Sequence, residues 1–206
     1  MFTGITQGLF TVTQVEVKPG MITYSVQLNK ALLSGLEIGA SVSVDGVCQT
    51  VIAIKGQEVT FNAIAETCRK TTLADIRQGQ KVSIERSATF GSEIGGHMMA
   101  GHVYGTAEIL RREINENNLQ LILHCPKLMM TYFFKKGFVG INGSSLTVND
   151  VDLMHDTITV DLIPHTLQLT DFANKRIGDK VNIELDATTV TIVETIKRLN
   201  LAAHPK

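Results

Sequence analysis

The chain has 206 residues and a formal net charge of −1, and its length fits either one large domain or two domains of about 100 residues. Its 44% hydrophobic and 19% charged residues are ordinary for a folded protein and exclude wholesale disorder. The lack of positive net charge, the aromatic content of only 5% and the absence of Trp argue against a protein that binds nucleic acid.

The cysteines are Cys48, Cys68 and Cys125. An odd number without metal-like spacing fits reduced thiols better than a disulfide framework, and it predicts a cytoplasmic protein. The N-terminal residues have neither the charge nor the apolar stretch of a secretory leader, and no apolar run approaches the roughly 18 residues of a membrane span. We therefore expect no membrane association.

An internal repeat organises the chain. Residues 43–51 (SVDGVCQTV) match residues 140–148 (GINGSSLTV) at a separation of 97, and residues 67–85 match residues 166–184 at a separation of 99. The two extra residues of the second copy fall in a loop, where a β-hairpin tolerates insertion. The sequence therefore predicts two homologous modules that meet near residues 95–102.

Each module has the pattern of a β-protein. An Asp-Gly turn at 45–46 interrupts an alternating segment, which is a strong hairpin signal. Short segments rich in β-branched residues, such as 58–64, predict further strands. About six short strands per module favour a small closed barrel, since closure removes exposed edges. Short helices are expected around 30–35 and 127–134. The predicted fold class is all-β, with two tandem barrels and a C-terminal helix.

The C-terminal segment differs from the rest of the chain. Ile192, Ile196, Leu199 and Ala203 recur at helical spacing and predict an amphipathic helix with a narrow apolar seam. This segment has no counterpart after the first module. The seam can pack either on its own barrel or on copies of itself in an oligomer, and the pattern leaves both possibilities open.

The two modules also differ at polar positions. Cys48 matches Ser145, and His102 matches Ile5. A free cysteine is most often a small buried side chain, but a polar sulfur or oxygen in both copies favours a position that faces a ligand. His97 and His102, in a Gly-rich stretch, favour acid–base chemistry over a surface role. No metal site is predicted, because no third ligand has a recognisable spacing.

At these residues the sequence resembles the riboflavin synthase family. The resemblance rests on MFTGI at the N-terminus, GVCQTV, GGHMMAGH, KGFVGINGSSLTV and LIPHTL, in order over nearly the whole chain. It implies two six-stranded Greek-key β-barrels, at residues 1–97 and 98–187, followed by a trimerisation helix at 188–206. It also implies a homotrimer in which the N-terminal barrel of one subunit faces the C-terminal barrel of another.

The resemblance further implies an activity. The family converts two molecules of 6,7-dimethyl-8-ribityllumazine into riboflavin and 5-amino-6-ribitylaminopyrimidinedione by transfer of a four-carbon unit, without a metal or redox cofactor. Two similar pockets with different polar residues would hold identical substrates in donor and acceptor roles. Lumazine and riboflavin are the implied ligands, and lumazine synthase is a further implied partner.

By resemblance, the catalytic candidates are Ser41, Cys48, His97 and His102. Phe2 is expected to close the N-terminal pocket, whose further contacts are Gly4, Ile5, Thr6, Gln49, Thr50, Asn62, Ala63, Ile64, Ala65, Glu66, Thr67, Gly101 and Val103. The C-terminal contacts are Lys136, Asn142, Ser145, Leu146, Thr147, Leu162, Ile163, Pro164, His165, Thr166, Leu167 and Asp186. The family often has Asn in the first turn and Asp in the second, and here Asp45 and Asn142 are exchanged, which puts a carboxylate role at Asn142 in doubt.

The sequence pattern leaves two other functions to consider. A non-catalytic lumazine- or flavin-binding protein of the same fold is the main alternative, but such relatives lose polar pocket residues, whereas this chain keeps Cys48, His97 and His102. A nucleic-acid-binding barrel is more distant, because charge and aromatic content speak against it. The enzyme interpretation is therefore favoured.

Overall fold

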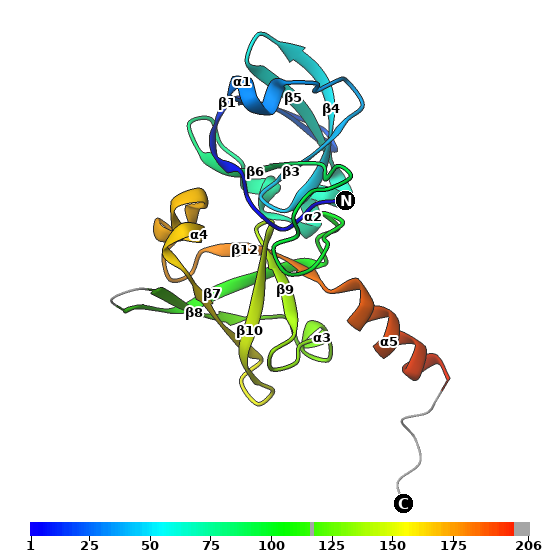
Figure 1. Ribbon diagram of the computed structural model, residues 1–206, viewed down its shortest axis with the longest axis vertical. Helices are drawn as coiled ribbons and strands as arrows, with labels where there is room; N and C mark the ends of the chain where they lie inside the picture. The colour runs from blue at the N-terminus through cyan, green and yellow to red at the C-terminus, as the bar shows by residue number, and fades with distance from the viewer. Residues whose placement is uncertain (116–117, 200–206) are drawn as a thin grey trace, which may run out of the picture.

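A computed structural model describes residues 1–115 and 118–199. Two closed six-stranded antiparallel barrels follow one another along the longest axis of the molecule (Figure 1). The elements of the first barrel are β1 (Gly8–Lys18), β2 (Met21–Gln27), α1 (Lys30–Leu33), β3 (Ser41–Val44), β4 (Val47–Lys55), β5 (Glu58–Ile64), α2 (Ala65–Lys70), η1 (Thr72–Asp75) and β6 (Lys81–Arg86).

The second barrel repeats this order. Its elements are β7 (Gly105–Asn115), β8 (Asn118–His124), α3 (Lys127–Met130), β9 (Phe138–Ile141), β10 (Ser144–Asp152), β11 (Thr157–Leu162), α4 (Pro164–Leu169), η2 (Asp171–Ala173) and β12 (Lys180–Leu185), and the chain continues into α5 (Ala187–Arg198). The first barrel closes in the strand order β1-β2-β5-β4-β3-β6, and the second closes in the corresponding order. The predicted fold class is confirmed, as are the two short helices expected near 30–35 and 127–134.

Matching hairpin turns join β3 to β4 and β9 to β10. Asp45 and Gly46 have φ of 46° and 81°, and Asn142 and Gly143 have φ of 45° and 87°. Two consecutive positive φ angles define the type I′ turn, which Asp-Gly and Asn-Gly favour because their backbones tolerate this region. The repeat seen in the sequence is therefore a repeat of backbone geometry, and it sets the same register in both hairpins.

Each barrel has its own hydrophobic core. Alternate residues of every strand point inward, and the first core includes the fully buried Tyr24, Phe61 and Ile84, while the second includes Ile109, Leu121 and others. Irregularities in the strand register recur at equivalent places in the two barrels, in β1 and β7 and again in β4 and β10. Such bulges bend a strand and help to close a barrel.

The barrels meet through their hairpin turns. A Cβ built on Gly46 would lie 2.5 Å from the backbone nitrogen of Gly143, so the two turns touch where neither tolerates a side chain. Asn182 donates to the carbonyl oxygen of Asp45 at 2.8 Å and to the hydroxyl of Thr72 at 2.9 Å, which ties β12 to the first barrel. The contact is polar and specific as well as close.

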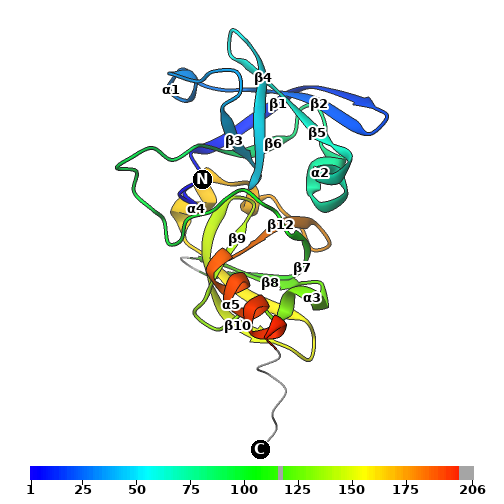
Figure 2. The same ribbon diagram turned by 90° about the vertical axis from the view of Figure 1, so that its right-hand side faces the viewer.

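Helix α5 lies beside the second barrel and runs away from the first, as Figures 1 and 2 show. Val190 and Val193 pack on the second core, whereas the predicted seam of Ile192, Ile196 and Leu199 is 40–61% exposed. The seam thus turns away from its own barrel; its fourth member, Ala203, lies outside the described residues. Within residues 1–115 and 118–199, no helix is long and apolar enough to cross a membrane.

Candidate functional site

Two short arms precede the barrels and pair with each other. The first arm is residues 1–7, and the second arm, residues 98–104, leads from the linker into β7. Phe2 N–H donates to the Met99 carbonyl at 2.7 Å, and Met99 N–H donates back to Phe2 at 3.0 Å. Phe2 and Met99 are equivalent positions of the repeat, so a local two-fold axis relates the arms.

Beyond this bridge, each arm crosses to the hairpin of the other barrel. The Cys48 N–H donates to the carbonyl of Gly101 at 2.9 Å, and the Ser145 N–H donates to the carbonyl of Gly4 at 2.9 Å. Both glycines have a φ of 75°, and a Cβ on Gly101 would lie 2.7 Å from the Cβ of Cys48. The arms approach so closely that only glycine fits.

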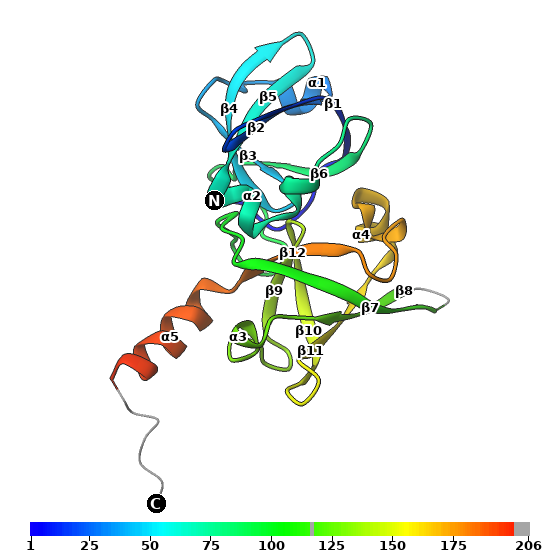
Figure 3. The ribbon, with the colours of Figure 1, turned by 180° about the vertical axis from the view of Figure 1, so that it is seen from behind.

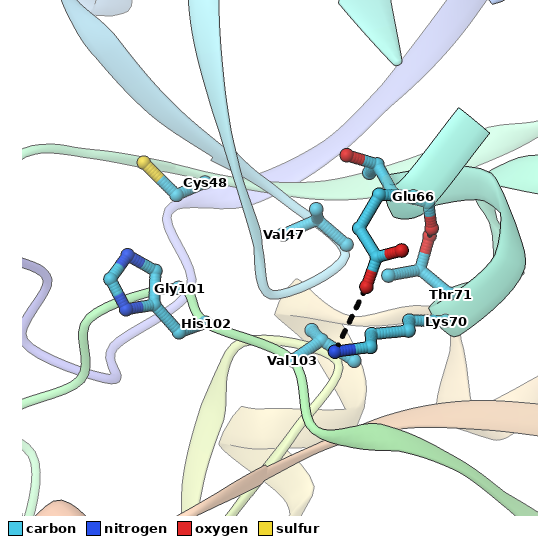
Figure 4. A pocket seen from close by; sticks show the side chains of 9 residues that line it. Val47, Cys48, Glu66, Lys70, Thr71, Gly101, His102 and Val103 are labelled. Carbon is cyan, nitrogen blue, oxygen red and sulfur yellow. Dashed lines mark hydrogen bonds and ion pairs between the residues drawn. The ribbon is translucent and has the colours of Figure 1, made fainter. Parts of the chain in front are cut away.

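The first pocket therefore combines the first barrel with the second arm (Figure 4). It is lined by Val47, Cys48, Glu66, Thr67, Lys70, Thr71, Gly101, His102 and Val103. Cys48 and His102 lie on one side of it, and the Glu66–Lys70 ion pair, at 3.0 Å, lies on the other. The ion pair is half-exposed, so it contributes little to stability, but its charges face the same space as the thiol and the imidazole.

The second pocket is its counterpart and combines the second barrel with the first arm. It is lined by Gly4, Ile5, Thr6, Glu93, Gly95, Ser144, Ser145, His165, Thr166, Leu169 and Thr170. Nearly every residue of one pocket has its repeat partner in the other. Helices α2 and α4 supply the outer walls, and Figure 3 shows both near the junction between the barrels.

The linker between β6 and the second arm adds a feature that the first pocket lacks. His97 is buried, and its Nδ1 lies 2.6 Å from the hydroxyl oxygen of Ser145. The imidazole stacks on Phe138 with ring centroids 5.1 Å apart, while its Nε2 has no hydrogen-bond partner in the part of the chain that the structure describes. Burial lowers the pKa of His97, and the charge of Asp186 opposes this shift.

These contacts favour a neutral His97. Burial of Asp186 would raise its pKa, but the hydrogen bonds from the side chain and backbone of Thr189 hold it below the usual value. Asp186 is the N-cap of α5, with its carboxylate 2.8 Å from the Thr189 N–H. A neutral imidazole beside a hydroxyl can accept the hydroxyl proton, so the arrangement can make the Ser145 oxygen more nucleophilic.

The four predicted catalytic residues do not form one cluster. Cys48 and His102 share the first pocket, but His97 contacts Ser145 of the second barrel. Ser41 pairs with Thr50 across β3 and β4 and lines neither pocket. The polar candidates thus form two pairs: Cys48 with His102 at the first hairpin, and Ser145 with His97 at the second.

Two residue sets predicted for the N-terminal pocket lie elsewhere. Gly4, Ile5 and Thr6 line the second pocket, because the arms are exchanged. Phe2 is only 1% exposed and lies behind Gly101, where a Cβ on the glycine would meet the ring at 2.9 Å. It therefore supports the pocket wall from the inside and does not close the mouth.

The alternation of the strands sorts the remaining predicted contacts. Cys48 and Thr50 point away from the first core, whereas Gln49 points inward and accepts a hydrogen bond from the hydroxyl of Tyr24 at 3.2 Å. Of the other N-terminal predictions, Glu66, Thr67, Gly101 and Val103 line the first pocket, while Asn62, Ala63, Ile64 and Ala65 occupy the end of β5 and the start of α2 without lining it.

The C-terminal predictions divide in the same way. Ser145, His165 and Thr166 line the second pocket, while Leu146 and Leu162 are buried in the second core and Leu167 packs against it. Outside the lining are Lys136, Thr147, Ile163, Pro164 and Asp186. Lys136 is exposed, with a φ of 68°.

Asn142 has a structural position. It is buried in the turn between the barrels, and its side-chain oxygen accepts the Asn182 N–H at 2.7 Å. Asp45 does the same for the Ser83 N–H at 2.7 Å. Each side chain binds the last strand of its own barrel, and neither turn residue lines a pocket, so the exchange of Asp and Asn between the turns leaves the pocket walls unchanged.

Several residues that line the pockets were not predicted from the sequence. Lys70 and Leu169 are helix positions one turn from predicted contacts, and helical spacing of three to four residues from Glu66 and Thr166 would have found them. Thr71 and Thr170 are a repeated pair whose hydroxyls donate to the carbonyls of Thr67 and Thr166. Glu93 and Gly95 belong to the linker, where no pattern indicates a pocket.

Comparison with known proteins gives a consistent answer. The lumazine binding domain model matches residues 3–87 and 100–186. The chain is 43% identical over 205 residues to riboflavin synthase of Escherichia coli (strain K12), an alignment that covers 99% of this chain and 95% of that one.

Solved structures agree with the sequence comparison. The fold is similar to that of LumP complexed with riboflavin, with a TM-score of 0.84 and 25% identity, over 90% of this chain and 100% of the other. It is also similar to LumP complexed with 6,7-dimethyl-8-(1′-D-ribityl) lumazine, with a TM-score of 0.81 and 26% identity, over 89% and 98% of the two chains.

Proposed function

The chain belongs to the riboflavin synthase family, with two lumazine binding domains, and from this premise we propose how its two pockets divide the work. The protein is a transferase that converts two molecules of 6,7-dimethyl-8-ribityllumazine into riboflavin and 5-amino-6-ribitylaminopyrimidinedione. The observation that carries the enzymatic assignment is the 43% identity to a riboflavin synthase over 99% of the chain.

The two substrates have the same structure but opposite roles. One lumazine gives up a four-carbon unit and the other receives it, so no net oxidation occurs and the two products balance the two substrates. The chemistry requires loss of a proton from the C7 methyl group of one lumazine and activation of the other as an electrophile. A protein with two similar but unequal pockets can bind one substrate in each and assign the roles by the polar groups nearby.

We assign proton transfer in the first pocket to His102, with Cys48 beside it. Both residues line that pocket, and the imidazole is exposed to it. In the second pocket we assign the equivalent role to Ser145 with His97, whose 2.6 Å contact provides a hydroxyl with an adjacent base. Ser41 is set apart from both groups, and we assign it at most a supporting contact.

Recognition of the ring edges is assigned to the pocket linings. Backbone groups of the arms at Gly4 and Gly101 and the side chains of Thr67 and Thr166 occupy equivalent places in the two pockets. Equivalent walls suit two identical substrates. The two pockets differ at equivalent positions of the repeat: His102 of the first pocket corresponds to Ile5 of the second, and Glu66 corresponds to His165. These differences then supply the difference in role.

We propose that the active protein is a homotrimer in which α5 brings subunits together. Residues 1–97 and 98–187 are taken as the two catalytic domains and residues 188–206 as the assembly segment. Supporting this, Ile192, Ile196 and Leu199 form an exposed apolar seam on α5. A trimer would bring the first pocket of one subunit to the second pocket of another, which brings two lumazines face to face. Lumazine synthase, which supplies the substrate, is a proposed partner, and the free thiols suit the cytoplasm.

The decisive assay supplies lumazine as the sole substrate and follows the appearance of riboflavin fluorescence. The enzyme should form one riboflavin for every two lumazines consumed. The alternative, a carrier similar to LumP, would bind lumazine or riboflavin without turnover and would purify with a yellow ligand in stoichiometric amount. Tight binding with no riboflavin formed would reject the enzymatic assignment.

A further inference from the structure

Two buried glutamates occupy equivalent places on the last strand of each barrel. Glu85 is in β6 and Glu184 is in β12, and they are 3% and 6% exposed. Neither lines a pocket. A carboxylate so deeply buried is costly unless hydrogen-bonded, so its partners reveal what it holds.

The partners of both glutamates are in the arms. Glu184 accepts the Ala100 N–H on one oxygen at 2.6 Å and the Gly101 N–H on the other at 3.0 Å. Glu85 accepts both the N–H and the hydroxyl of Thr3 on the same oxygen, at 2.6 and 2.7 Å. Burial raises the pKa of both carboxyl groups, and the arm donors partly offset that rise.

The two carboxylates are used differently. Both oxygens of Glu184 accept hydrogen bonds from the second arm. The second oxygen of Glu85 forms no hydrogen bond of standard geometry among residues 1–115 and 118–199, although the Gly4 N–H lies near enough to lower the pKa of this carboxyl group. The substitution Glu184→Gln would place an amide NH₂ group opposite one of the two backbone donors, so one of the two hydrogen bonds would be lost. A glutamine at Glu85 keeps the oxygen that Thr3 uses.

The bonds of Glu184 continue into the first pocket. The same Gly101 that donates to the carboxylate accepts the N–H of Cys48 through its carbonyl. His102 is the next residue. The carboxylate therefore fixes the one peptide segment that both contacts Cys48 and carries His102.

We propose that Glu184 is the positioning residue of the first pocket: its carboxylate holds the second arm in the turn that brings His102 into the pocket with Cys48. The functional part of this inference rests on the proposed riboflavin synthase activity. Glu184 does not touch the substrate, and its effect passes through Gly101. Glu85 is its matched control, because it binds the first arm, which contacts Ser145 and not Cys48.

The test compares Glu184→Gln with Glu85→Gln in the full-length protein. In each variant, iodoacetamide labelling of Cys48 is measured by mass spectrometry relative to Cys68, an internal reference thiol that lines neither pocket. Loss of a charge-assisted hydrogen bond should raise the Cys48-to-Cys68 labelling ratio about tenfold in Glu184→Gln. The ratio in Glu85→Gln should stay within about twofold of the wild type.

Kinetics provide the second readout. Glu184→Gln should lower kcat for lumazine about tenfold, while KM changes less, because a misplaced arm affects the reacting geometry more than the binding walls. A general loss of fold would instead reduce the amount of active enzyme and would appear in gel filtration and circular dichroism. A folded Glu184→Gln variant with wild-type labelling and wild-type kcat would overturn the proposal.

Two further measurements keep the inference testable. If Glu184→Gln does not fold, hydrogen exchange of the wild-type Ala100 and Gly101 amides decides: exchange as fast as that of exposed linker amides would overturn it, and strong protection would support it. If the wild type binds lumazine but forms no riboflavin, the proposed function fails, and the labelling ratio still decides whether Glu184 positions the arm.

Discussion

The two pockets share one framework and differ in what that framework carries. In both, an outward-facing hairpin residue, a short helix and an arm from the opposite module meet. The first pocket has Cys48, His102 and the Glu66–Lys70 ion pair, whereas the second has Ser145, Ile5, His165 and Leu169 at the matching places. Duplication preserved the geometry and changed the chemistry.

The second difference is the linker. His97 and Gly95 approach the second pocket from outside the repeat and give Ser145 a close basic partner. His97 and His102 thus come from the same stretch, residues 95–102, although His97 contacts Ser145 of the second barrel and His102 lines the first pocket.

The largest effect on this comparison should come from His102→Ala. Removing a general acid–base group costs about a hundred- to ten-thousandfold in rate, so kcat should fall by about a thousandfold while lumazine affinity changes little. Stopped-flow measurement of riboflavin formation, with equilibrium binding by fluorescence, separates the two quantities. Ile5→Ala, at the matching place in the other pocket, is the control and should cost far less.

Equal losses of kcat in the two arm variants would contradict the division of roles. So would unchanged turnover in His102→Ala, which would remove the imidazole from the chemistry. Either result would show that the arms contribute walls alone.

The next effect should come from Gly101→Ala. A new Cβ would lie 2.7 Å from the Cβ of Cys48 and 2.8 Å from its nitrogen, so the arm must shift, and a displacement near 1 Å can cost about a hundredfold in rate. Gly20→Ala is a matched control, because Gly20 has a φ of 76° but no atom within 4 Å of the built Cβ. It carries the backbone strain without the clash.

Initial rates and melting temperatures of both variants check this prediction. Gly20→Ala should lose some stability but keep its activity. If both variants lost activity equally, left-handed backbone strain, and not the close approach of the arm, would explain the glycine.

A smaller effect is expected from Cys48→Ser, which makes the hairpin residue the same in both pockets. The backbone bond to Gly101 remains, so only the contacts of the thiol change, and turnover should fall about tenfold. The reciprocal Ser145→Cys replaces the hydroxyl that His97 contacts and tests the second pocket. A Cys48→Ser enzyme with full turnover would show that the difference between sulfur and oxygen has no role.

The smallest effect on turnover is expected from Asp45→Asn, which makes the two turns alike. Burial raises the pKa of Asp45 from 3.8 to about 6. Because the folded pKa is above the unfolded one, the wild type loses stability as the pH rises from about 4 to 6, by roughly 3 kcal/mol, and the loss persists at higher pH. Asp45→Asn should therefore be more stable than the wild type at pH 8, with little difference at pH 4.

Thermal unfolding at both pH values measures this, and Asn142→Asp is the reciprocal variant. It should introduce a similar pH-dependent loss at the second turn. A melting temperature of Asp45→Asn below that of the wild type at pH 8 would contradict the prediction and would mean that the carboxylate contributes more than an amide in this turn.

Much of the fold could be predicted from the sequence because it depends on local rules. The Asp-Gly and Asn-Gly turns fix the hairpin register, and the repeat carries that register from one barrel to the other. The amphipathic pattern also identified the last helix. It could not show that Val190 and Val193 would face the barrel, because two adjacent apolar stripes on one helix compete for the same surface.

The candidate site was less predictable because each pocket combines one barrel with the arm that precedes the other barrel. Gly4 could have met its own hairpin or the opposite one, since Cys48 and Ser145 offer the same backbone N–H, and local sequence does not distinguish them. For the same reason, Phe2 was predicted to close the N-terminal pocket. Glu184 was visible only as the repeat partner of Glu85, because burial of a carboxylate depends on distant donors.

The exchanged arms also have a consequence for the order in which the protein is made. Ribosomal synthesis releases the chain from its N-terminus, and the hydroxyls of Thr6 and Ser144, 3.2 Å apart in the folded protein, are separated by 138 residues of sequence. The first barrel can close early, but its pocket is complete only after Gly101 and His102 have been synthesised. The first arm can form its contact with Ser145 only later, once β10 has been synthesised. Both pockets are thus completed late and require nearly the whole protein. A shortened chain could still form the first barrel, but it would lack complete pockets.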